Sequence, residues 1–133
     1  MRGRGFLQRC LRLISRSFAP RKLDRAKMML VWQQFTPADG RSYRELMVSD
    51  ESDWYLFEEI AGILELALDG SWTSRLDGLD QRYWDLSARS GRLTLHLEHY
   101  IGIRLFPLDG ADADPASTVL LEQAFDVLRT HKA

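Results

Sequence analysis

Apolar residues recur with a helical period near the middle of the chain. Between residues 53 and 68 an apolar stripe occupies one side of the segment and most acids the other, which predicts an amphipathic helix. Asp50 or Ser52 is expected to cap its first free N–H groups, and Gly70 to end it in the left-handed conformation.

A second helix is predicted near the C-terminal end. It begins at Pro115, where the missing N–H group costs no hydrogen bond, and Asp114 caps it. Its buried face consists of Leu120, Leu121, Ala124, Phe125 and Leu128.

Strict alternation of apolar and polar residues elsewhere predicts strands. From Leu93 to Leu105 the apolar residues keep one phase, interrupted only by His99. A two-residue turn at His99-Tyr100 would send the two apolar halves to opposite faces, so we predict one long strand bent near Gly102 instead of a hairpin. The predicted strands are Met29–Phe35, Tyr43–Val48, Trp72–Leu76, Arg82–Ala88 and this long strand, which runs from Arg92 to Phe106.

The resulting order, β-β-α-β-β-β-α, predicts the α+β class. We expect a mostly antiparallel sheet of about five strands with two helices packed on one face. The chain has 133 residues, 45% of them hydrophobic, and four tryptophans, which is enough for the core of one globular domain. Residues 28–133 are expected to form that domain.

Charge divides the chain in two. Residues 1–27 contain nine Lys and Arg and one acid, a net charge of +8, while the remaining residues contain nine basic and eighteen acidic groups, a net charge of −9. Such an acidic domain repels phosphates, so the folded part is not expected to bind nucleic acid. It favours basic protein partners instead.

The basic extension, residues 1–27, allows three interpretations. Apolar residues at roughly helical spacing between the arginines are typical of an amphipathic helix on an anionic membrane surface. The extension can equally be a solvated tail, or upstream sequence preceding a start at Met28 or Met29. One cysteine, Cys10, excludes an intrachain disulfide, and no apolar run is long enough to span a membrane. We therefore expect a cytoplasmic location.

The stretch from His96 to His99 is the main candidate for chemistry. In a strand, His96 and Glu98 point to the same side and are suited to hold one metal ion, with Asp85 approaching from the neighbouring strand. The alternative is that these two residues lie on a solvent or interface side, while His99 is a hydrogen-bonded core histidine. This solvent or interface interpretation is favoured over the metal site, so no metal or other cofactor is predicted.

An aromatic-acid cluster supplies the candidate binding surface. Alternation buries either Trp84 or its neighbours Tyr83 and Asp85, so part of this set is expected to be exposed, as in protein-binding hot spots. No phosphate-binding glycine loop, nucleophile elbow or Cys/His pair is present, which disfavours an enzyme. The predicted partner-binding residues are Tyr83, Trp84, Asp85, His96, Glu98 and Tyr100.

The stretch LDGLDQRYWDLSARSGRLTLHLEHYIGIRLFP, residues 76–107, resembles a block of small uncharacterised bacterial single-domain proteins. Many compact acidic domains of that type are similar to immunity proteins of bacterial toxin systems. The resemblance implies a non-enzymatic protein that binds and blocks a basic toxin. Two alternatives stay open: a small metal-binding protein or enzyme using His96 and Glu98, and a peripheral membrane protein anchored by residues 1–27.

Overall fold

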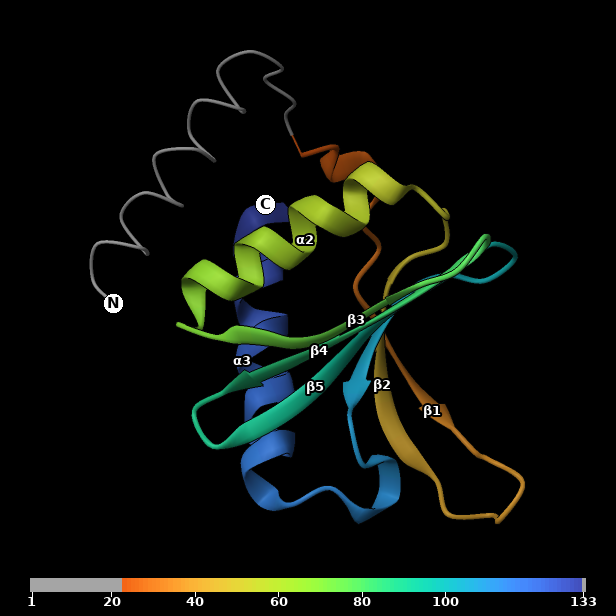
Figure 1. The fold of residues 1–133 in the computed structure, drawn as a ribbon, viewed down its shortest axis with the longest axis vertical. Coiled ribbons are helices and arrows are strands. Elements are labelled where there is room, and N and C mark those ends of the chain that lie inside the picture. Colours follow the sequence, from red (N-terminus) through yellow and green to blue (C-terminus); the bar gives the residue numbers. More distant parts are fainter. Residues whose placement is uncertain (1–22, 133) are drawn as a thin grey trace.

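The computed structural model describes residues 23–132, which form one six-stranded antiparallel sheet and two long helices (Figure 1). The strand order is β1-β2-β6-β5-β4-β3. The α+β class is thereby confirmed, with six strands where about five were predicted. The elements in chain order are η1 (Arg25–Lys27), β1 (Val31–Phe35), β2 (Tyr43–Ser49), α2 (Trp54–Ala67), β3 (Ser71–Asp77), β4 (Gln81–Ala88), β5 (Gly91–Glu98), β6 (Gly102–Pro107), η2 (Gly110–Asp112) and α3 (Pro115–Lys132).

Both helices pack on the same face of the sheet. The strand register connects one row of side chains from β1 to β4, and this row meets α3 at one end and α2 at the other. Trp32 contacts Phe125 of α3 with ring centroids 5.1 Å apart, and Phe57 of α2 contacts Trp84 at the same distance. The row consists of Trp32, Leu46, Leu105, Leu95 and Trp84.

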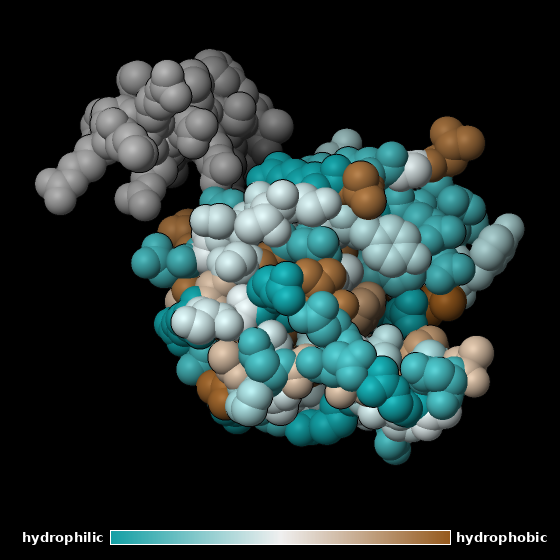
Figure 2. Space-filling view, turned by 60° about the horizontal axis from the view of Figure 1, so that its bottom comes forward, coloured by the Kyte–Doolittle hydropathy of each residue, from teal (hydrophilic) through white to brown (hydrophobic). Residues whose placement is uncertain are grey.

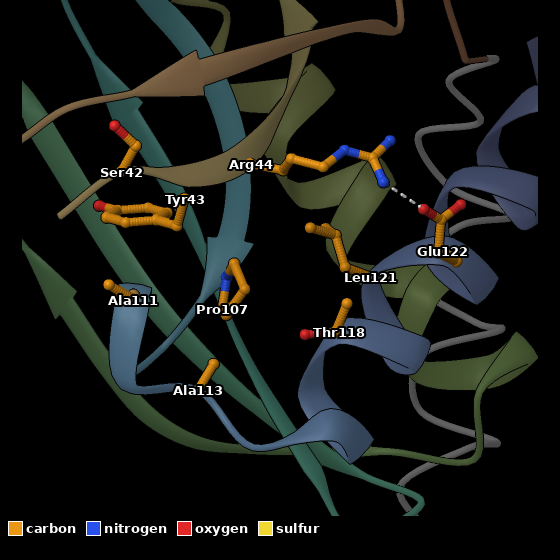
Figure 3. A pocket seen from close by; sticks show the side chains of 10 residues that line it. Ser42, Tyr43, Arg44, Pro107, Ala111, Ala113, Thr118, Leu121 and Glu122 are labelled. Carbon is orange, nitrogen blue, oxygen red and sulfur yellow. Dashed lines mark hydrogen bonds and ion pairs between the residues drawn. The ribbon is translucent and has the colours of Figure 1, made fainter.

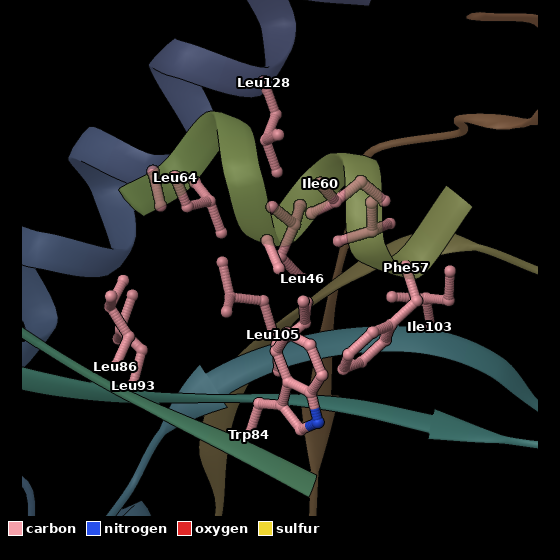
Figure 4. Close-up of a cluster of buried hydrophobic side chains, with 14 of the residues drawn as sticks. Leu46, Phe57, Ile60, Leu64, Trp84, Leu86, Leu93, Ile103, Leu105 and Leu128 are labelled. Carbon is pink, nitrogen blue, oxygen red and sulfur yellow. The ribbon is translucent and has the colours of Figure 1, made fainter. Parts of the chain in front are cut away.

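The core fills the space between this face and the two helices (Figure 4). Leu46, Leu95 and Leu105 from the central strands are fully buried, as are Ile60 and Leu64 from α2. Burial of a leucine or isoleucine side chain contributes about 1.5–3 kcal/mol, so the strand and helix residues of this core both stabilise the fold.

The prediction of one long strand between Leu93 and Leu105 is wrong. The chain reverses through a three-residue turn, 99–101, and Leu97 pairs with Ile103. An odd number of turn residues keeps the alternating residues on the same face, which a two-residue turn cannot do. Gly102 makes the turn possible: its φ is +110°, and a Cβ atom there would lie 2.1 Å from the Ser49 carbonyl oxygen.

The ends of α2 also differ from the prediction. Asp53, not Asp50 or Ser52, caps the helix, and its Oδ1 accepts from the N–H groups of Tyr55 and Leu56 at 2.9 and 3.2 Å. Asp69, not Gly70, adopts the left-handed conformation, with φ +52°. The predicted cap of α3 is confirmed, since the Asp114 carboxylate accepts from the Ser117 N–H at 3.0 Å.

One buried cation joins α2 to the sheet. The Arg82 side chain is 4% exposed and donates to both oxygens of Asp77, at 2.9 and 3.2 Å, and to Glu58 at 3.1 Å. These hydrogen bonds hold the pKa of Asp77 below its usual range. The guanidinium carbon also lies 4.4–4.8 Å from the rings of Trp54, Phe57 and Trp84.

Most of the basic extension predicted for residues 1–27 lies outside the described residues. Within the described part, Leu23 packs against the core, and Lys27 donates to Asp53 at 2.7 Å. Met28, 1% exposed, belongs to the core itself. Across residues 23–132, no helix combines the length and the apolar character needed to cross a membrane.

Candidate functional site

The opposite face of the sheet has no helix over it among the described elements; we call it the helix-free face. Register pairs place one row of side chains across all six strands on this face. The neighbouring rows add polar and aromatic residues, so the face mixes charges with rings. The row consists of Val31, Met47, Arg104, His96, Tyr83 and Leu76.

A chain of contacts runs along this face from β4 to β1. The rings of Tyr83 and His96 stack with centroids 4.0 Å apart and planes 14° apart. Arg104 donates from Nη2 to His96 Nδ1 at 2.7 Å and lies 3.4 Å from the Glu45 carboxylate. Gln33 Nε2 donates to Oε1 of the same carboxylate at 2.6 Å. We call these five residues the polar ladder.

Burial sets the protonation of the ladder's histidine. His96 is 2% exposed, and this burial, together with the adjacent Arg104 cation, lowers its pKa to about 4. The imidazole is therefore neutral at pH 7. Because Nδ1 accepts from Arg104, the ring proton is on Nε2. Neither His96 Nε2 nor Arg104 Nε has a hydrogen-bond partner among the described residues.

Exposed apolar groups surround the polar ladder. Their exposed fractions are 46% for Val31, 36% for Phe35 and 65% for Leu76. We call these three residues the apolar rim. Tyr83, at the end of the ladder, is itself 40% exposed. Between rim and ladder, Phe106 lies 6.3 Å from the His96 ring, measured between centroids. Figure 2 shows the side of the domain that faces down in Figure 1. This side is largely polar, and its apolar side chains form small patches, several of them in a central hollow.

The structure separates the six predicted partner-binding residues into three groups. Tyr83, Asp85, His96 and Glu98 share the helix-free face, where Asp85 accepts from Thr94 Oγ1 at 2.7 Å. Tyr100, 88% exposed, lies in the turn between β5 and β6.

Trp84 needs a correction, because it lies on the helix side, 7% exposed, in edge contact with Phe57 and Trp72. Its indole N–H donates to Asp77 at 2.9 Å. A partner cannot reach Trp84 without opening the core.

His99 was predicted as the alternative core histidine and is instead exposed in the 99–101 turn. It contacts the Tyr100 ring at 4.7 Å.

The described residues contain no group of three His, Cys, Asp or Glu side chains placed to hold a metal ion. At His96 the Arg104 guanidinium occupies Nδ1, and its charge opposes a second cation at the same place. Among the described residues, the ladder is held together by hydrogen bonds and one ring stack.

Sequence reasoning missed Arg104, Glu45, Gln33 and Phe35. Alternation in β1, β2 and β6 could have assigned each of them to the polar side of its own strand. Their convergence on His96 depends on β6 lying between β2 and β5, which no local pattern specifies.

A shallow pocket of about 220 Å³ lies between β2, β6 and the first turns of α3 (Figure 3). Its two charged groups, Arg44 and Glu122, pair with each other at 2.6 Å. The volume is below the range of typical ligand sites, roughly 300–1,000 Å³, so this pocket is not the candidate site.

A family model described as Protein of unknown function (DUF3630) matches residues 39–114. The matched range extends from the β1–β2 turn to the cap of α3. It contains four residues of the polar ladder and leaves out Gln33. No curated protein and no solved structure matches the chain.

Proposed function

The chain belongs to the DUF3630 family, and we propose that it is a non-enzymatic protein-binding module whose contact surface is the helix-free face. The observation that carries this proposal is the combination of a rigid polar ladder with an exposed apolar rim on a face that no described helix covers.

The ladder lowers the entropic cost of binding. Tyr83 is 40% exposed, yet its ring is held against His96, which Arg104 and Glu45 fix in turn. A ring already held in place loses little freedom when a partner contacts it. Tyrosine and arginine are also enriched among the residues that dominate binding energy.

Charge favours a basic partner. Residues 28–133 carry a net charge of −9, which speeds the encounter with a positively charged protein and disfavours nucleic acid. A basic toxin that acts on nucleic acid is a partner of this class. The immunity-protein role implied by the resemblance is our narrower proposal, and it requires that the captured partner be such a toxin.

The test uses the full chain as bait and measures the affinity of the captured basic protein for matched variants. Val31 and Val119 have similar exposed fractions, 46% and 53%, but Val31 lies on the helix-free face and Val119 on α3. Val31→Arg and Tyr83→Ala are each expected to weaken binding about tenfold or more, which corresponds to about 1.4 kcal/mol.

Val119→Arg adds the same charge elsewhere and is expected to change the affinity less than about twofold, below about 0.4 kcal/mol. Equal effects of the two valine variants would show that only overall charge matters. Unchanged affinity in Tyr83→Ala would remove the helix-free face from the contact surface.

A further inference from the structure

A second surface, on α2, combines acids with exposed apolar groups. The stretch from Glu45 to Ser74 contains no Lys, Arg or His. On the side of α2 away from the sheet, Tyr55 and Leu66 are 59% and 74% exposed. We call this surface the outer face of α2; its other members are Glu59, Gly62 and Glu65. The acids of the stretch are Glu45, Asp50, Glu51, Asp53, Glu58, Glu59, Glu65 and Asp69.

The described chain begins beside this surface. Lys27, the last residue of η1, donates to Asp53, the residue that caps α2. Leu23, the first described residue, packs against the core, and the Lys27–Asp53 contact holds the described segment that starts there beside the first turn of α2. Figure 1 shows η1 next to that end of the helix.

Residues 1–22 have the complementary composition. They contain seven Lys and Arg and no acid, with apolar residues in the gaps between the arginines. The basic residues are Arg2, Arg4, Arg9, Arg12, Arg16, Arg21 and Lys22, and the apolar ones include Phe6, Leu7, Leu11, Leu13, Ile14 and Phe18. A surface with acids around Tyr55 and Leu66 matches such a segment in charge and in apolar groups.

We propose that residues 1–22 dock on the outer face of α2 of the same chain. α2 has 14 residues and is about 21 Å long, and 22 residues reach about 33 Å even with the short rise of a helix, so the segment can cover it. The tether supplies an effective concentration on the order of millimolar, so weak contacts suffice. This docking uses a different surface from the helix-free face, and either proposal can fail without the other.

The single cysteine provides the test. A nitroxide attached to Cys10 of the full chain broadens the amide signals of residues near it. In about 0.01 M salt we expect loss of amide cross-peak intensity between Tyr55 and Leu66, and none in the distant turn around Gly40. In about 1 M salt, where the screening length falls from about 30 to about 3 Å, the α2 signals are expected to recover. Full α2 intensity at low salt would overturn the proposal.

Matched charge variants show whether the contact depends on α2. Glu59→Lys with Glu65→Lys is expected to restore the α2 signals at low salt. Asp80→Lys with Glu122→Lys makes the same change in net charge on other elements and is expected to leave the loss of intensity in place. The proposal is wrong if both variants behave alike.

A mixed sample shows whether the segment docked on the outer face of α2 belongs to the same chain or to a second copy. Isotope-labelled chain with its cysteine blocked is combined with unlabelled chain carrying the nitroxide, so that any broadening comes from another copy. We expect the α2 signals of the labelled chain to keep their intensity. Broadening in this mixture would overturn docking within one chain and assign the outer face of α2 to a second copy.

Vesicles of phosphatidylserine and phosphatidylcholine supply a competing anionic surface. If residues 1–22 are held on α2, the Glu59→Lys, Glu65→Lys chain is expected to bind these vesicles more strongly than the control variant. Equal binding by the two variants would mean that the segment is not held on α2.

Discussion

The burial of His96 predicts that the domain loses stability in mildly acidic solution. In the folded chain the imidazole is neutral, stacked on Tyr83 and next to Arg104. Lowering the pH protonates this histidine in the unfolded chain first, because its pKa there is about 6.5 and in the folded chain about 4. The unfolded state therefore binds more protons in this range and gains free energy relative to the folded state.

The structure gives the size of this effect. One pKa unit corresponds to about 1.36 kcal/mol, so the difference between 6.5 and about 4 amounts to about 3 kcal/mol when fully developed. The stability is fully present above pH 6.5, falls by about 2 kcal/mol at pH 5, and changes little below pH 4. Asp53 and Asp77, whose pKa values are lowered in the folded chain, contribute stability that is lost only at still lower pH. Among the described groups whose pKa is shifted, only His96 changes the stability between pH 6.5 and pH 5.

Urea unfolding followed by tryptophan fluorescence at pH 7.5, 6 and 5 measures the effect. His96→Phe keeps a ring against Tyr83 and cannot titrate, so its free energy of unfolding is expected to stay nearly constant over this range. His96→Gln serves the same purpose if the Phe variant does not fold. His131→Ala, at an exposed position, is the control and is expected to lose as much stability as the parent chain. An equal loss of unfolding free energy in both His96 variants and in the parent chain would show that His96 does not cause the pH dependence.

Three further predictions concern stability and use the same urea assay. Arg82→Ala removes a buried guanidinium that donates to Asp77 and packs against three aromatic rings; because Asp77 is 41% exposed and stays solvated, the expected cost is about 2–3 kcal/mol, from lost hydrogen bonds and packing. A cost below about 1 kcal/mol would show that the buried guanidinium stabilises the fold little. Gly102→Ala forces a Cβ atom against the Ser49 carbonyl oxygen. It is expected to cost at least about 2 kcal/mol more than Gly40→Ala, where φ is also positive but no atom lies near the added Cβ. Equal costs for the two variants would mean that the positive φ alone causes the loss. Arg41→Ala breaks an exposed ion pair with Asp112, which water and salt screen, and is expected to leave the urea midpoint unchanged within error; a clear loss of stability would show that this exposed pair stabilises the fold.

Local patterns were enough to predict most elements of the fold. The predicted range of α2, residues 53–68, agrees with the structure within one residue at each end, and the predicted start and cap of α3 are present. The long strand from Arg92 to Phe106 failed because alternation is the same in a continuous strand and in a hairpin with a three-residue turn. Only the close approach of Gly102 to β2, far away in the sequence, distinguishes the two arrangements.

The candidate site could be predicted only in part for the same reason. Alternation correctly separates Trp84 from Tyr83 and Asp85, but it does not say which face the helices cover. The structure buries Trp84, and the predicted binding set loses that residue. His96 was singled out for a neighbour on its own strand, Glu98, whereas its contacts are Tyr83 and Arg104 on the two flanking strands.

The sequence by itself determined which residues alternate, where helices begin, and that a basic segment precedes an acidic domain, because these properties depend on neighbours within a few positions or on composition. The order of strands was decided by tertiary structure, and with it the polar ladder, whose members come from five strands. The neutral state of His96 was decided in the same way. A pKa depends on burial and on charges that surround the group in space, and the Arg104 guanidinium reaches His96 only when β6 pairs with β5.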